Sequence, residues 1–260
     1  MSCVNVRGCR IGEGRPKVIL PIVEPHESDV LKKAEEFSTL QADCVEWRVD
    51  LFEGAGDLRA VAHCLARLRV ALKDKLLLVT LRTQPEGGNA ELDHTAYLRY
   101  LRTVLDTDCA DLIDIEFFTA GDDLPSLVTQ AHTAGVKVVC SSHDFHKTPP
   151  RAELVARMAA MQQAGADLPK LAVMPQGRAD VLPACRADVL ELLAATAEMA
   201  DHHPETPVIT MSMGALGAVS RLCGEAFGSA MTFANPGTAS APGQVGLDVV
   251  NSVLDSLRLG

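Results

Sequence analysis

The chain has 260 residues, of which 47% are hydrophobic, and a formal net charge of −10 at pH 7. This length fits one large α/β domain or two ordinary ones, and the hydrophobic fraction is sufficient for a substantial core. The negative charge and the lack of a basic run in the sequence argue against nucleic acid or an anionic membrane as a partner. A small-molecule substrate stays open, because a cationic pocket can form locally in an acidic protein.

The cysteines and the N-terminal sequence indicate a reducing compartment. None of the eight cysteines belongs to a CxxC pair or has the spacing of zinc ligands. Cys3 and Cys9 could face each other across a terminal hairpin, with a disulfide as the minor alternative. Residues 1–17 contain no apolar signal segment, and no apolar run in the sequence approaches the length of a membrane span. We therefore expect a cytoplasmic protein.

Short apolar, β-branched runs alternate along the chain with segments of helical periodicity. The predicted strands are residues 17–23, 43–49, 75–82, 111–117, 136–143, 169–174, 207–213 and 229–233. The predicted helices include residues 29–41, 57–73, 93–107, 123–134, 151–164 and 245–259. This alternation favours an α/β fold, a single (β/α)8 barrel over residues 1–260. A doubly wound sheet is the alternative, but residues 23–26 (VEPH) lack the glycine-rich turn expected after its first strand.

Three further segments have expected places in this barrel. Residues 1–15 are predicted to form a hairpin that closes the barrel floor. The sequence RADVL at 178–182 recurs at 186–190, which indicates a short duplication at the start of a helix whose first turn Pro183 would suit. Residues 234–244, rich in glycine, proline and alanine, are long enough to form a lid over an active site.

Charged side chains occupy one face of several predicted strands. Because side chains alternate along a strand, Glu46, Arg48 and Asp50 share a face, as do Thr80 with Arg82 and Asp114 with Glu116. The apolar faces should contact the helices, which places these charges inside the barrel near its C-terminal mouth. Such burial is unfavourable unless the charges pair and bind something polar. A purely structural ion-pair network is the alternative.

Two residues on neighbouring predicted strands point to imine chemistry. Lys170 lies within the apolar run 169–174, and His143 closes the run 136–143. A buried lysine that is held neutral attacks carbonyl carbons, and histidine is the usual proton carrier beside it. The small Ala172 on the same face leaves room above the amine. The alternatives are a lysine paired with Asp114 or Glu116 and a structural histidine.

The chain resembles the type I 3-dehydroquinate dehydratase family, the Schiff-base-forming dehydratases of the shikimate pathway, over essentially its whole length. The similarity is carried by the order and spacing of short stretches: GEGRPK (12–17), EWRVD (46–50), TLRT (80–83), EGG (86–88), SSHDFHKTP (141–149), DLPKLAVMPQ (167–176), TMSMG (210–214), SRL (220–222) and SAPGQ (240–244). The resemblance implies a (β/α)8 fold, commonly a homodimer, and a lyase that converts 3-dehydroquinate to 3-dehydroshikimate by syn elimination of water. It implies no cofactor and no metal.

The resemblance also implies residue roles. Lys170 would form the imine with the C3 ketone, His143 would transfer protons at C2 and C1, and Glu86 would orient His143. The implied substrate-binding residues are Glu46, Arg48 and Arg82 for hydroxyls, Arg221, Ser240 and Gln244 for the carboxylate, and Met211, Met213 and Phe233 for the apolar wall. At the end of the first strand, Pro21 stands where some relatives have a substrate-contacting serine.

Three other functions fit parts of the sequence. A class I aldolase also uses a barrel lysine imine, but the chain lacks a glycine-rich phosphate site between the seventh and eighth predicted strands. A metal-dependent hydrolase would normally have an HxH pair at the end of the first strand, where this chain has PIVE (21–24). A non-catalytic metabolite sensor on the same scaffold is the third alternative.

Overall fold

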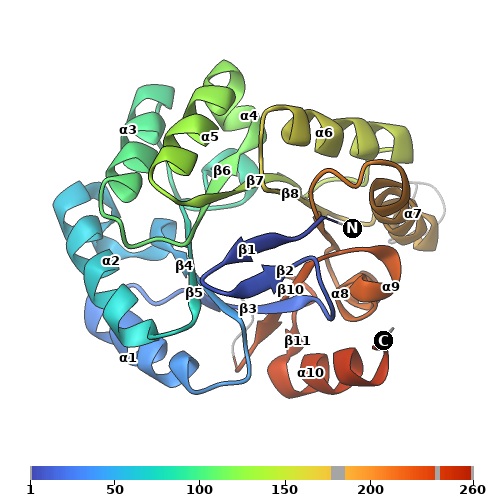
Figure 1. Cartoon of the computed structure of the whole chain (residues 1–260), viewed down its shortest axis with the longest axis horizontal. Coiled ribbons are helices and arrows are strands. Elements are labelled where there is room, and N and C mark those ends of the chain that lie inside the picture. The colour runs from blue at the N-terminus through green and yellow to red at the C-terminus, as the bar shows by residue number, and fades with distance from the viewer. Residues whose placement is uncertain (1, 177–184, 238–240, 259–260) are drawn as a thin grey trace.

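Eight parallel strands form a barrel that is enclosed by helices (Figure 1) in the computed structural model, which describes residues 2–176, 185–237 and 241–258. The barrel strands are β3 (Lys17–Ile22), β4 (Cys44–Arg48), β5 (Leu76–Thr80), β6 (Leu112–Glu116), β7 (Lys137–Asp144), β8 (Leu168–Val173), β9 (Ile209–Ser212) and β10 (Met231–Asn235). They follow one another in chain order, and β10 pairs with β3. A bridge between Val208 and Ser229 connects β9 with β10. The predicted (β/α)8 fold is confirmed.

The helices surround this barrel and coincide closely with the predicted ones. They are α1 (Glu27–Ser38), α2 (Leu58–Leu72), α3 (His94–Leu105), α4 (Phe117–Ala120), α5 (Leu124–Thr133), α6 (Arg151–Gln163), α7 (Arg186–His202), α8 (Ala218–Leu222), α9 (Gly224–Phe227) and α10 (Leu247–Ser256). Short 3-10 helices are η1 (Val49–Leu51), η2 (Glu53–Gly56), η3 (Gln84–Glu86) and η4 (Gly121–Asp123). The helix predicted over 245–259 starts later, because β11 (Val245–Gly246) first pairs with β10.

The duplicated segment and the expected lid are only partly described. α7 begins at Arg186, so the second copy of RADVL forms its first turn, whereas the first copy and Pro183 lie outside the described residues. In the segment 234–244, Ala234 and Asn235 belong to β10, and residues 238–240 lie outside the described residues.

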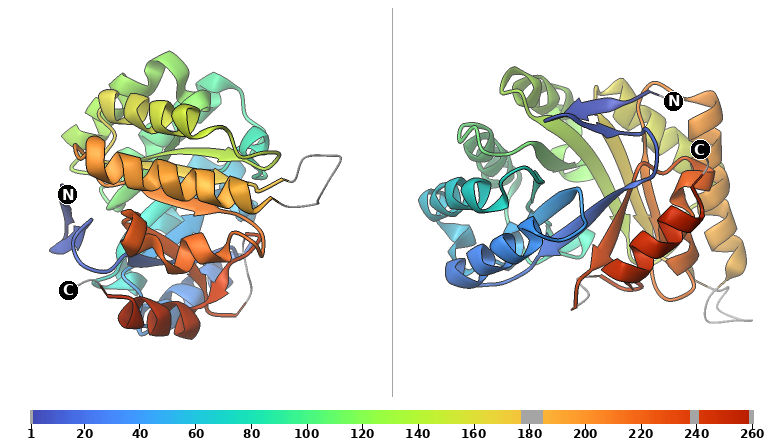
Figure 2. Two further views of the ribbon diagram at one scale, coloured as in Figure 1. Left: turned by 90° about the vertical axis from the view of Figure 1, so that its right-hand side faces the viewer. Right: turned by 60° about the horizontal axis from the view of Figure 1, so that its bottom comes forward.

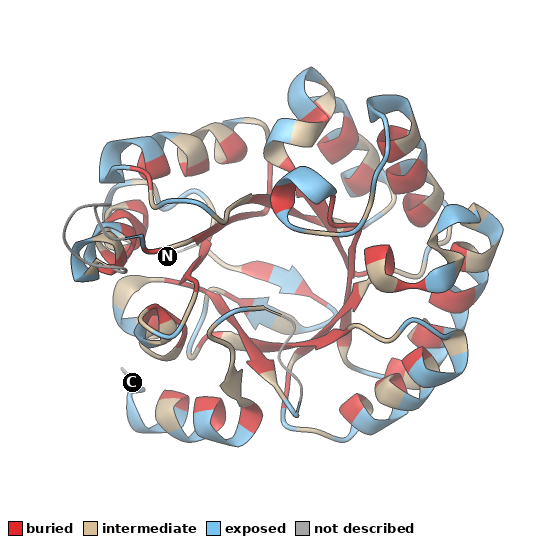
Figure 3. Cartoon of the chain, turned by 180° about the vertical axis from the view of Figure 1, so that it is seen from behind, coloured by how far each residue is buried: buried red, intermediate tan, exposed pale blue. Residues whose placement is uncertain are grey.

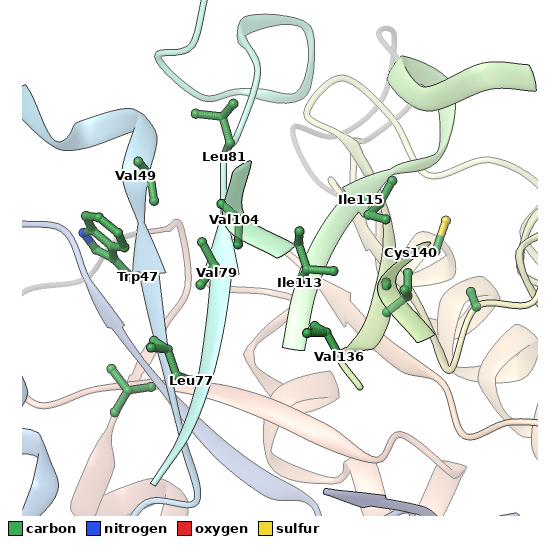
Figure 4. Packing of buried hydrophobic residues seen from close by; sticks show 14 of the residues in the cluster. Trp47, Val49, Leu77, Val79, Leu81, Val104, Ile113, Ile115, Val136 and Cys140 are labelled. Carbon is green, nitrogen blue, oxygen red and sulfur yellow. The ribbon is translucent and has the colours of Figure 1, made fainter. Parts of the chain in front are cut away.

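The main hydrophobic core lies between the strands and the helices. Trp47, Val79 and Ile113 are buried in it and point outward from β4, β5 and β6 (Figure 4). The prediction that the apolar strand faces contact the helices is therefore correct. The opposite faces are left to line the interior of the barrel.

The N-terminal hairpin packs against the inner apolar residues of the barrel. It consists of β1 (Val4–Val6) and β2 (Cys9–Ile11), which pair antiparallel and lie across one end of the ring (Figures 1 and 2). Val4, Val6 and Ile11 join a cluster with Ile19 and Leu76, which lie in the first halves of their strands. The hairpin therefore covers the N-terminal end, and Figure 3 shows it behind the ring when the barrel is viewed from the opposite end.

A repeated aspartate contact joins the strands in pairs at this end. An aspartate just before β4, β6 and β8 accepts a hydrogen bond from a backbone N–H of the preceding strand, at 2.8 Å in each case: Val18 to Asp43, Leu77 to Asp111 and Val138 to Asp167. The backbone N–H of each aspartate also donates to the carbonyl of the same partner. Each aspartate therefore fixes the register of two strands. At the fourth strand pair, Ser229 Oγ accepts from the Thr210 N–H at 3.0 Å.

We expect Asp167→Ala to lower the free energy of unfolding by about 1–3 kcal/mol, because it leaves the buried Val138 N–H without its acceptor. Urea unfolding measures the change, and Glu35→Ala on the exposed face of α1 is the control, expected within about 0.5 kcal/mol of the unmodified protein. Equal losses in the two variants would contradict a register role for Asp167.

Candidate active site

The C-terminal end of the barrel contains a cavity of about 450 Å³. This volume lies in the range of small-molecule sites. Every predicted site residue within the described ranges lines the cavity, namely Glu46, Arg48, Arg82, Glu86, His143, Lys170, Met211, Met213, Arg221, Phe233 and Gln244. The other predicted residue, Ser240, lies outside the described residues.

Arg82 is the centre of a buried ionic network. Its Nη2 donates to Asp114 Oδ2 at 2.9 Å, and its Nη1 donates to Glu116 Oε1 at 2.8 Å and to Ser141 Oγ at 3.0 Å. The same Nη1 lies 3.4 Å from Glu86 Oε2. The planar guanidinium thus contacts three carboxylates at once, two from β6 and one from η3. The predicted inward-facing charges do pair, and Asp114 and Glu116, which the sequence offered as possible partners of Lys170, both pair with Arg82.

Glu86 holds His143 from one side of the ring. Glu86 Oε2 lies 2.9 Å from His143 Nδ1 and accepts the His143 backbone N–H at 3.2 Å. Because Nδ1 faces the carboxyl group, Nε2 is the ring nitrogen left for the cavity. Burial, followed by the charges of Arg82 and Lys170, holds the pKa of His143 well below its ordinary value. Burial also raises the pKa of Glu86 to about 8, against the opposing effect of Arg82.

Lys170 extends from β8 into the interior of the barrel. Its Nζ lies 3.3 Å from Asp114 Oδ2 and 5.0 Å from the centroid of the Phe233 ring. The predicted alternative, an ion pair with Asp114, is therefore present. The amine still borders the cavity, beside the small Ala172, so it has space in which to meet a ligand.

Arg221, on α8, is a buried cation at the cavity wall. Its Nη2 donates to the Pro242 carbonyl at 3.3 Å, and its Nη1 lies 3.5 Å from Met211 Sδ. Within the described ranges no carboxylate forms an ion pair with it, and its Nε has no hydrogen-bond partner. Burial lowers its pKa to about 10, which still leaves the group charged at neutral pH. Such a cation is suited to an anionic ligand.

The two polar residues of β4 are held by different partners. Thr80 Oγ1 donates to Glu46 at 2.9 Å, and Arg48 makes a two-pronged contact with Asp50 at 2.8 and 2.7 Å. Asp50 does not share the strand face with Arg48 as predicted, because β4 ends at Arg48 and Asp50 lies in η1. From there it also accepts the backbone N–H of Asn89 at 3.1 Å.

The cavity also contains residues that the sequence reading did not assign. They include Val23, Leu51, Asn89, Phe145 and Pro242. Their positions in the sequence could have identified most of them, because they follow a barrel strand by a few residues, where the active-site loops of this fold lie. Their side chains carry no charge or nucleophile that could have distinguished them in the sequence.

A family model for type I 3-dehydroquinase matches residues 18–259. The chain belongs to this family. It is 45% identical to the 3-dehydroquinate dehydratase of Bacillus subtilis over 258 residues, which are 99% of this chain and 98% of that protein. The crystal structure of the type I 3-dehydroquinate dehydratase of Clostridium difficile with covalently modified comenic acid has a TM-score of 0.92 and 44% identity, and the match covers 98% of each chain. For the Enterococcus faecalis enzyme the TM-score is 0.89 at 39% identity, with 98% and 99% covered. The resemblance inferred from the sequence is confirmed.

In this member of the type I 3-dehydroquinase family, we expect Arg82→Met to lower the free energy of unfolding by about 3–5 kcal/mol at neutral pH, because it leaves buried carboxylates unpaired. Burial raises the pKa of Asp114, but Arg82 and then Lys170 outweigh it, so the net pKa is lowered. The stabilisation that Arg82 provides by pairing with ionised Asp114 is thus present at neutral pH and is lost as the pH falls and Asp114 takes up a proton. Urea unfolding at decreasing pH should show the deficit of Arg82→Met shrinking, and Arg82→Lys should lose less; a deficit independent of pH would contradict this origin.

Proposed function

We propose that Lys170, His143 and Glu86 carry out the dehydration of 3-dehydroquinate to 3-dehydroshikimate, the reaction of the type I family, through a lysine imine. The observation that supports these roles is that both side chains line the same cavity. The His143 ring enters it from β7, and the Lys170 amine enters it from the neighbouring strand β8. The register sets Ser141 beside Lys170 and His143 beside Ala172, so the two functional side chains lie on successive levels of the barrel.

The imine makes removal of the C2 proton feasible. Lys170 Nζ attacks the C3 carbonyl carbon, and loss of water gives a protonated imine that can accept an electron pair. His143 then takes a proton from C2, leaving an enamine, and returns it to the C1 hydroxyl group, which departs as water. Hydrolysis of the imine releases the product and restores the Lys170 amine. One histidine serves both transfers: its lowered pKa keeps the free ring unprotonated as a base, and the imidazolium formed on taking the C2 proton is then a strong acid toward the C1 hydroxyl.

The remaining cavity residues fit the other groups of the substrate. Among the cations that line the cavity, Arg221 is the one for which the described residues provide no carboxylate partner. We therefore assign it to the substrate carboxylate, together with Gln244 and Ser240. Glu46, Arg48 and Arg82 are assigned to the C4 and C5 hydroxyls. Met211, Met213 and Phe233 form the apolar wall.

Two predictions about assembly and location accompany this proposal. The homodimer and the cytoplasmic location stay predictions; light scattering after size-exclusion chromatography tests the first. No helix within the described parts of the chain is long and apolar enough to cross a membrane.

Incubation with 3-dehydroquinate and borohydride should leave a substrate-derived adduct on Lys170, detected by intact-protein mass spectrometry and peptide mapping. Lys170→Ala should form no adduct and lose turnover, measured by ultraviolet absorbance of the enone product, while its circular dichroism spectrum stays unchanged. His143→Ala should still form the adduct but release product at least about 100-fold more slowly, because positioned acid–base catalysis is lost. Appreciable turnover by folded Lys170→Ala would falsify the imine mechanism.

The His143–Glu86 pair should give kcat/KM an acid limb. The pair must lose a proton before His143 can act as a base, so kcat/KM should rise as the pH approaches the Glu86 pKa of about 8. Glu86→Gln should move this limb to lower pH, because burial and the charge of Arg82 then hold the His143 pKa low without an opposing carboxylate. The pH profiles of the two proteins test this, and an unmoved limb in Glu86→Gln would rule out titration of the pair.

A further inference from the structure

The amine of Lys170 lies between two groups that attract positive charge. Asp114 Oδ2 is 3.3 Å from Nζ on one side, and the face of Phe233 is 5.0 Å away on another. Asp114 is fully buried, and its second oxygen accepts the Ser141 hydroxyl at 2.6 Å. A carboxylate and an aromatic face both stabilise a cation at this distance, and more strongly where water is excluded.

The neighbouring carboxylates are held by other partners. Glu86 contacts His143, and Glu116 accepts from the hydroxyls of Thr83 and Thr119 at 2.6 and 2.7 Å. Within the described parts of the chain, Asp114 is the acid that lies within ion-pair distance of Lys170. The charge on Nζ therefore has one direct anionic partner among these residues.

Arg82 keeps that partner charged. Its Nη2 donates to the same Asp114 oxygen at 2.9 Å. Burial alone would raise the Asp114 pKa, but Arg82 and then Lys170 reverse the effect, and the net pKa is lowered. The anion is thus present before any ligand binds and needs no rearrangement.

We propose that Asp114 is the counter-ion of the Lys170 imine and that it favours the protonated iminium over the neutral carbinolamine from which it forms. This inference rests on the proposed function of Lys170. In addition to its contact with Arg82, Asp114 then acts as a positioning residue for the Lys170 imine, which accepts the electron pair in the reaction.

The charge changes of the reaction define where Asp114 acts. When the carbinolamine loses water, the nitrogen lone pair forms the C=N bond, the C3–O bond breaks, and the leaving hydroxide takes a proton from the His143–Glu86 pair. The nitrogen gains one positive charge in this step. It loses that charge when C2 gives up its proton, and it regains the charge when the C1–O bond breaks. Asp114 therefore assists both steps in which water leaves.

Other charged groups surround the amine and set its background electrostatics. They are Glu46 and Arg48 from β4, Arg82 and Glu86 after β5, Asp114 from β6, His143 from β7 and Arg221 from α8. Glu116 offers a matched control. Like Asp114 it is a fully buried acid of β6 that accepts from Arg82, at 2.8 Å, but the structure gives it no contact with Nζ.

The test compares Asp114→Asn with Glu116→Gln. Each protein is incubated with 3-dehydroquinate and cyanoborohydride over a range of pH, and the rate of adduct formation on Lys170 is measured by mass spectrometry. Asp114→Asn should trap about 10–100-fold more slowly near neutral pH, the expected effect of losing one charge-assisted contact. Glu116→Gln should trap at the rate of the unmodified enzyme, and Asp114→Glu should restore the rate in part.

The outcomes separate the two proposals. If the unmodified enzyme forms no adduct, the imine function fails. If the unmodified enzyme forms the adduct but Asp114→Asn traps at the same rate, or Glu116→Gln slows trapping equally, the counter-ion role is overturned while the imine stands.

A second measurement needs no variant. In unmodified enzyme with ¹⁵Nζ-labelled lysine and bound 3-dehydroquinate, NMR should detect a protonated iminium nitrogen at mildly alkaline pH. A neutral imine nitrogen under those conditions would overturn the proposal even if Asp114→Asn fails to fold.

Discussion

The buried guanidinium of Arg82 is the interaction on which the rest of the site depends. Without it, the buried carboxylates of Glu86, Asp114 and Glu116 would repel one another, and this repulsion would force protons onto some of them. Arg82 donates to both Asp114 and Glu116, and its charge, followed by that of Lys170, lowers the pKa of Asp114. Glu86, farther from it at 3.4 Å, is left with a raised pKa and can exchange a proton with His143. The distances to this one cation thus help to set two different acid strengths, a lowered pKa at Asp114 and a raised pKa at Glu86.

The two ends of the barrel differ in the interactions that hold them together. At the N-terminal end, the apolar hairpin and the aspartates that bind backbone N–H groups fix strand register, and rigidity is the result. At the C-terminal end, charged side chains enclose a cavity, and their burial is tolerated because they pair with each other. Because the same strands run through both ends, the contacts at the N-terminal end also hold in place the buried charged side chains at the C-terminal end.

Much of this arrangement could be predicted from the sequence, because period-two and helical patterns are local. The strands, the inward side of Arg82 and Asp114, and the positions of Lys170 and His143 follow from alternation along each strand. The predictions were wrong where a strand ends early, as for Asp50, because the end of a strand depends on contacts with other segments. The short helix that carries Arg221 was missed for the same reason: its position is set by packing against β9 and β10.

The sequence by itself therefore determined the barrel, its inward-facing charges and the two residues suited to imine chemistry, since each follows from the period of a local segment. The tertiary structure alone decided which charges meet. Three contacts depend on distances between residues far apart in the chain: Asp114 rather than Glu116 reaches Lys170, Glu86 faces Nδ1 of His143, and Arg221 faces the cavity with no carboxylate partner among the described residues. Electrostatic energy varies with those distances and with the exclusion of water, and neither is a property of any local stretch of sequence.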